Sequence, residues 1–132
     1  MGALEEKREI KKAQESWLPE KNKELSELSG GGTMKFDVEW ATFAGDLQAM
    51  NWLEFNGPQQ VLNALRMIGT DDLGKEALRD AVKKVVVRNV ADEKAKSMAI
   101  DGGVFTLACA FAKSPGGRFS HDQIRDFLMS KM

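Results

Sequence analysis

Three consecutive glycines at positions 30–32 divide this 132-residue chain into two segments of different character. Residues 3–29, before the glycines, are mostly charged helix formers with a thin apolar stripe. The glycines themselves predict a flexible linker over residues 30–33. Residues 34–132 carry most of the bulky apolar side chains. We therefore expect a helical peptide segment at residues 1–29 and a single domain at residues 34–132.

The overall composition is that of an ordinary soluble globular protein, with 42% hydrophobic and 30% charged residues. The net charge of −1 gives no general attraction to nucleic acid or to an anionic membrane. No apolar run is long enough to cross a bilayer, and the single cysteine, Cys109, excludes an intrachain disulfide. These features together favour a cytoplasmic location.

The N-terminal segment reads as one or two amphipathic helices. Pro19 fits the first turn of a second helix and would break or kink a continuous one. Helices this short and polar are marginal alone in water, so the segment needs a surface to lie against. The side chains that we expect to be buried in that contact are apolar: Ile10, Trp17, Leu18, Leu25 and Leu28.

Helix start and stop signals recur through residues 34–132. Capping residues and apolar spacing predict helices over 37–55, 58–69 and 70–90, a buried central helix over 104–112, and a last helix from 120. Propensity would also allow a strand at 85–87, but the flanking residues keep helical spacing. The last helix has the clearest signature, a capping box of Ser120 and Gln123. The predicted fold class is all-α, a compact bundle of about five helices.

The predicted helix 37–55 has apolar side chains on two opposite sides. One side is bulky, and the other is a line of mostly small residues ending in a tryptophan: Val38, Ala41, Gly45, Ala49 and Trp52. Small residues let another helix approach closely, and tryptophan often anchors such contacts. The line therefore predicts a partner-binding groove for an amphipathic helix. The alternative is a central helix that its own domain covers on both sides.

Taken together, the linker and the groove predict a non-catalytic interaction domain that binds an amphipathic helical segment of another protein. The glycine joint favours fusion of a partner-derived helical ligand, residues 1–29, to a domain that starts near Met34. Tethering would raise the effective concentration of a weak ligand into roughly the millimolar range. A single natural gene product with a glycine-rich hinge is the alternative, and a free domain with an exposed groove could instead form a homodimer.

Motifs for catalysis, metals and cofactors are missing from the sequence. His121 is the only histidine and Cys109 the only cysteine, so a His or Cys metal cluster is excluded. Neither phosphate-binding glycine motif occurs. Cys109 lies between two alanines in the most apolar segment, which is typical of a small buried residue. We therefore predict no enzyme activity, no cofactor and no metal.

A nucleic-acid-binding domain is the rival hypothesis. Residues 75–96 hold seven Lys or Arg and four acidic residues. On a helix, Lys83, Lys84 and Arg88 would line one polar face and contact phosphates. A charged outer face is also the usual state of a bundle helix, and no aromatic platform for bases is evident.

Overall fold

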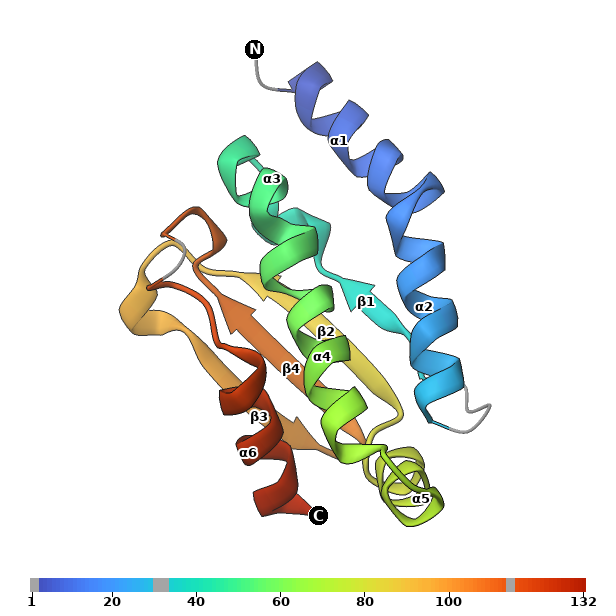
Figure 1. Ribbon diagram of the computed structural model, residues 1–132. Coiled ribbons are helices and arrows are strands. Elements are labelled where there is room, and N and C mark those ends of the chain that lie inside the picture. The colour runs from blue at the N-terminus through green and yellow to red at the C-terminus, as the bar shows by residue number, and fades with distance from the viewer. Residues whose placement is uncertain (1–2, 30–33, 114–115) are drawn as a thin grey trace.

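The computed structural model describes residues 3–29, 34–113 and 116–132, and it shows an α/β fold in place of the predicted all-α bundle (Figure 1). The predicted linker, residues 30–33, lies outside the described residues. The helices are α1 (Ala3–Glu15), α2 (Trp17–Leu28), α3 (Leu47–Asn56), α4 (Pro58–Ile68), α5 (Asp72–Ala81) and α6 (His121–Lys131). The strands are β1 (Phe36–Val38), β2 (Lys84–Asn89), β3 (Ser97–Asp101) and β4 (Val104–Cys109). Short 3-10 turns are η1 (Trp40–Phe43), η2 (Glu93–Ala95) and η3 (Phe111–Lys113).

The four strands form one mixed sheet in the order β1-β2-β4-β3. β1 and β4 both run parallel to β2, with Phe36 opposite Val85 and Val85 opposite Phe105. β3 runs antiparallel to β4, with Ala99 opposite Thr106. The strands β1 and β3 therefore form the two edges of the sheet.

The two faces of the sheet differ because side chains alternate along each strand. In β2, Val85 and Val87 are buried, whereas Lys84 and Arg88 are exposed on the opposite face. Helices α3, α4 and α6 lie over the buried side of the sheet (Figure 1). We call this side the helix face and the other side the open face.

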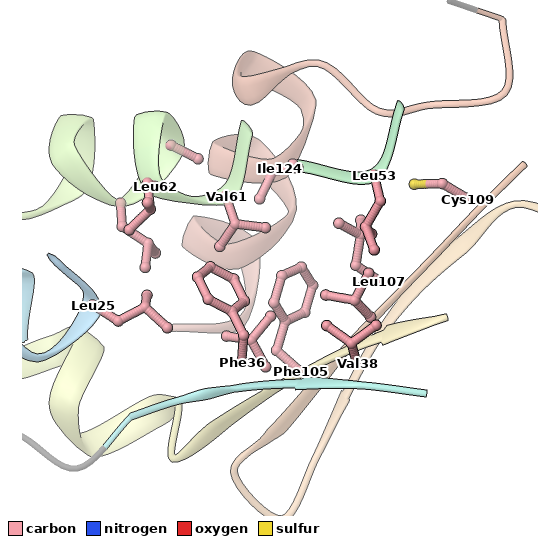
Figure 2. Close-up of a cluster of buried hydrophobic side chains, with 14 of the residues drawn as sticks. Leu25, Phe36, Val38, Leu53, Val61, Leu62, Phe105, Leu107, Cys109 and Ile124 are labelled. Atoms are coloured by element: carbon pink, nitrogen blue, oxygen red, sulfur yellow. The ribbon is translucent and has the colours of Figure 1, made fainter. Parts of the chain in front are cut away.

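The hydrophobic core fills the space between the helix face and these helices. Fully buried side chains from the sheet and from two helices contribute to it: Phe105 and Leu107 from β4, Leu62 from α4, and Ile124 from α6. Figure 2 shows these side chains pointing toward one another from the sheet and from the helices above it. The sheet thus forms one side of the core, whereas the sequence predicted a core formed by helices alone.

The prediction of an all-α helical bundle is wrong in three segments. Residues 84–89 and 104–109, predicted as helix, are the two central strands, and residues 97–101, which lie between two predicted helices, form the edge strand β3. The predicted helix 37–55 is divided into β1, η1 and α3. The physical reason is that short apolar runs fit the pattern of a helix and that of a strand equally well. In this fold, strands that are distant in the sequence lie side by side and supply the hydrogen bonds of the sheet.

Helix signals of local origin are confirmed. α4 begins at Pro58 and is capped by Gly69, and Asp71 caps α5 by accepting from the Gly74 amide at 2.7 Å. Both halves of the capping box are present at α6, where Ser120 and Gln123 bond each other's main chain. These signals depend on residues three or four apart, so they act whatever the tertiary fold.

Candidate helix-docking interface

The N-terminal segment packs along one side of the α/β domain through α2. Leu25 is completely buried and belongs to the main core cluster, where it points from α2 toward Phe36, Val61 and Leu62 (Figure 2). The C-terminal ends of α2 and α4 also approach closely, because a Cβ on Gly69 would lie 3.4 Å from the Leu28 carbonyl oxygen. A leucine side chain in another segment's core is the geometry of a helix seated in a groove.

Polar contacts surround the buried leucine. The Asn22 side-chain oxygen accepts from the Phe36 main-chain N–H at 2.8 Å, so α2 satisfies a donor of the edge strand β1. Glu24 forms an ion pair with Arg66 of α4 at 2.9 Å. The ammonium group of Lys21 lies 3.8 Å from the Glu54 carboxylate, and the Lys21 side chain is only 13% exposed. These contacts fix the position of α2 along α4 and β1.

The helix α1 makes a looser contact with α3. The Glu6 carboxylate accepts from the Gly45 main-chain N–H at 2.9 Å, an exposed hydrogen bond. A cleft of about 230 Å³ lies between the two helices, lined by Glu5, Arg8, Glu9, Leu47 and Asn51. Ala13 is the only residue of α1 in the described structure that is fully buried. The firm part of the interface therefore belongs to α2.

The five side chains predicted as ligand contacts all lie against the domain's core. Leu25 is fully buried, while the others are half-buried and pack on the core cluster: Ile10, Trp17, Leu18 and Leu28. The boundary between α1 and α2 lies at Ser16, and Pro19 lies in the first turn of α2, as the sequence predicted for a second helix. Their role as contacts of a partner-derived ligand stays a prediction.

The five predicted groove residues do not share a helix face, because the helix they were assigned to is not formed. Val38 lies in β1 and Ala49 in α3, and both are core residues. Ala41 is exposed in η1, and Trp52 is 47% exposed on α3. Gly45 lies between η1 and α3 with a φ of +78° and contacts α1 through Glu6. Their role in partner binding stays a prediction.

The predicted basic residues lie on the central strand β2 and on the bend before it, instead of on a helix. Lys84 and Arg88 project from the open face of β2, and each meets a carboxylate next to it on or after β1. Lys84 lies 3.1 Å from Asp37, and Arg88 makes two hydrogen bonds to Glu39. The hydrogen bond from Arg88 lowers the pKa of Glu39 below its usual value. Lys83 donates to the Arg79 carbonyl at 2.6 Å.

A polar network closes the carboxyl end of β2. The buried Asn89 amide donates to the Thr42 carbonyl at 3.1 Å and to Asp46 at 3.4 Å, and its main-chain N–H donates to the Thr42 hydroxyl. Asp46 also caps α3 through the Ala49 amide. This network holds η1 and the start of α3 against the sheet. It explains why the chain bends at Gly45, inside the predicted helix.

A second hollow of about 500 Å³ lies beyond the end of β2, lined by Ala91, Asp92, Glu93 and Lys113. Cys109 ends β4 nearby and is fully buried, as the sequence predicted. Burial raises the pKa of the Cys109 thiol to about 12, so it is protonated at neutral pH. Over residues 3–29, 34–113 and 116–132, no group of three or more His, Cys, Asp or Glu is arranged to hold a metal ion.

Comparison with known proteins does not assign a family. No protein-family model, curated protein or solved structure matches the chain. Within the described part of the chain, no helix has the length and apolar character needed to cross a membrane.

Several interface residues had no recognisable signal in the sequence. Asn22, Glu6 and Arg66 are polar residues on charged helices, and their contacts depend on where each helix lies in the fold. Asp46 did carry a signal, because Gly45–Asp46 before an apolar segment is typical of a helix start.

Proposed function

We propose that residues 34–132 form a non-catalytic protein-interaction domain whose groove, along α4 and β1, binds an amphipathic helical segment. In this chain residues 3–28 occupy the groove. The observation that carries the proposal is the complete burial of Leu25 in the domain's core, because Leu25 belongs to the segment before the three glycines. The rim of ion pairs and hydrogen bonds around it is typical of a binding interface.

The groove has features that would select its ligand. The cavity for Leu25 requires an aliphatic side chain, and Asn22, one turn earlier, reaches the free edge of β1. Arg66 favours an acidic residue at the position of Glu24. A ligand helix with an amide, an acid and a leucine at these spacings would therefore be preferred over other amphipathic helices.

The test is to separate the segment from the domain after folding. A protease site placed within residues 30–33 of the full chain allows cleavage, and a labelled peptide of residues 3–29 is then added in excess. We expect the bound segment to remain associated after cleavage and to exchange with the free peptide. Isothermal titration calorimetry on the peptide-depleted domain would give an affinity in about the micromolar range, as is common for short helical ligands.

Matched peptide variants identify the contact. Replacing both Trp17 and Leu18 by alanine should weaken binding by roughly 30-fold or more, since both side chains pack on the core. Leu4→Ala is the control, because Leu4 is 60% exposed. Equal affinities for the two variants would contradict the proposal. Irreversible unfolding on release of the segment would also contradict it, because the two helices would then be an integral part of the domain.

A further inference from the structure

The edge strand β3 presents main-chain hydrogen-bonding groups away from the sheet. β3 joins β4 through Gly102 and Gly103, whose φ values of +59° and +84° are those of a type I′ hairpin turn. In such a hairpin the residues that flank the turn, Asp101 and Val104, form a hydrogen-bonded pair. Alternate residues of β3 therefore face β4, and the N–H and C=O groups of Met98 and Ile100 face outward.

Hydrogen bonds on the other side of β4 support this assignment. The Gly103 and Cys109 carbonyls accept from Lys84 at 3.2 Å and from Val90 at 2.9 Å, so the odd-numbered residues of β4 face β2. The even-numbered residues of β4 consequently face β3, where their partners are Asp101, Ala99 and Ser97. Two residues with outward groups, Met98 and Ile100, remain along the edge.

The side chains of β3 divide cleanly between the two faces. Met98 and Ile100 are half-buried on the helix face and pack against the core cluster. Phe127 of α6 is also half-buried, and it stacks on Phe105 with 5.8 Å between ring centroids. The other β3 side chains, Ser97, Ala99 and Asp101, are exposed on the open face. The edge thus has an incompletely covered apolar flank beside its outward main-chain groups.

We propose that β3 pairs with β3 of a second copy of this chain, in antiparallel register with Ala99 opposite Ala99. The two four-stranded sheets then form one continuous sheet across a two-fold axis. Met98 lies opposite Ile100 of the second copy in both hydrogen-bonded pairs, which gives four main-chain hydrogen bonds. On the open face, Ser97 lies opposite Asp101 of the second copy, and its hydroxyl can donate to that carboxylate.

The register follows from self-complementarity. A shift by two residues in one direction places Ile100 opposite Lys96, whose ammonium group is already bonded to the Gly116 and Arg118 carbonyls. The opposite shift places Met98 opposite Gly102 in the turn. Only the register centred on Ala99 overlaps all five residues of β3 and matches each apolar side chain with another.

The strand lacks several of the features that keep natural edges from pairing, and Asp101 is its one charged residue. Residues 97–101 contain neither lysine nor proline, and each residue pairs with one residue of β4, so β3 has no bulge. The paired surface is small, since each copy contributes one five-residue strand and its flank. We therefore expect a weak dimer that forms in about the micromolar to millimolar concentration range.

Sedimentation equilibrium of the full chain tests the proposal over about 10 μM to 1 mM, the range suited to a small interface. We expect the average mass to rise from 14.6 kDa toward twice that value. Ala99→Glu would place two glutamates opposite each other beside both Asp101 side chains, and should weaken the dimer at least about tenfold. Mixing Ala99→Glu with Ala99→Lys should restore it as a mixed dimer. Ala44→Glu, at an exposed alanine between η1 and α3, should have no effect.

Hydrogen exchange of the unaltered chain gives a measurement that needs no variant. The Met98 and Ile100 amides should become slower to exchange as the protein concentration rises, whereas the exchange of exposed amides in α5 should not change. A monomer at about 1 mM overturns the proposal. A dimer that Ala99→Glu leaves intact also overturns it, as does a dimer in which the exchange of these two amides does not depend on concentration. If β3 instead pairs with a strand of a different protein, the chain alone would remain a monomer.

Discussion

The two edge strands of the sheet differ in what lies beside them. At one edge, β1 is three residues long, and the chain's own helix α2 lies beside it and binds the Phe36 N–H through Asn22. At the other edge, β3 is five residues long and α6 packs near it, but no hydrogen bond between described residues uses the outward main-chain groups of Met98 and Ile100. At β1 a helix of this chain supplies a hydrogen-bonding partner, whereas at β3 we propose that a second copy of the chain supplies it.

At the edge covered by α2, the stability of the fold should depend most strongly on Leu25. Leu25→Ala leaves a cavity between α2 and the core, so we expect a loss of about 3 kcal/mol in the free energy of unfolding. Urea denaturation monitored by circular dichroism measures it. Leu73→Ala is the matched control, because Leu73 is 76% exposed on α5, and it should change stability by less than about 0.5 kcal/mol. Similar losses in the two variants would mean that α2 does not hold the edge closed.

A smaller effect is expected from the single hydrogen bond at the strand. Asn22→Ala leaves the Phe36 N–H without its acceptor and should lower stability by about 1 kcal/mol, with a faster exchange of the Phe36 amide. The exposed Asn51→Ala, on α3, should leave both quantities nearly unchanged. Unaltered exchange at Phe36 in the Asn22 variant would show that packing alone protects β1.

The smallest effect is expected from the ion pair that joins the residue after β1 to β2 on the open face. Arg88 lowers the pKa of Glu39, so the pair stabilises the fold above the ordinary value of 4.5 and loses this effect as the pH falls through the lowered pKa. Because both side chains are more than one third exposed, Glu39→Gln should cost about 0.2–1 kcal/mol at pH 7. Urea denaturation at a series of pH values should show the difference vanish in acid. Exposed Glu76→Gln is the control, and a difference that persists in acid would contradict this account.

What the sequence could predict depended on how far apart the interacting residues lie. Caps at Pro58, Asp71 and Ser120 act within one helical turn, and each helix begins where its cap predicts. The strands β2 and β4 lie in segments that the sequence predicts as helix, because short apolar runs such as the three valines of β2 fit a buried helix as well as a buried strand. Gly102 and Gly103, just before the predicted helix 104–112, form the turn between β3 and β4, and two glycines between apolar runs are typical of such a hairpin turn.

Only part of the candidate interface could be predicted from the sequence, for the same reason. The apolar stripe of the N-terminal segment, which includes Leu25, could be recognised from its spacing. The surface on which this stripe packs could not be predicted. It is formed by β1 and α4 together, and the sequence of neither element shows that the other lies beside it. The position of Asn22 against Phe36 likewise becomes visible when the strand edge has been placed.

The contact between Asn22 and Phe36 also has a consequence for the order of folding. It joins residues 14 positions apart, whereas the pairing of Phe36 with Val85 must close a loop of 49 residues. Shorter loops close with less loss of entropy, and contacts that are near in sequence generally form faster. During synthesis, moreover, Asn22 and Phe36 are both made before any residue of β2. We therefore expect β1 to meet its covering helix first, so that this rim of the sheet is protected from other nascent chains before the sheet itself exists.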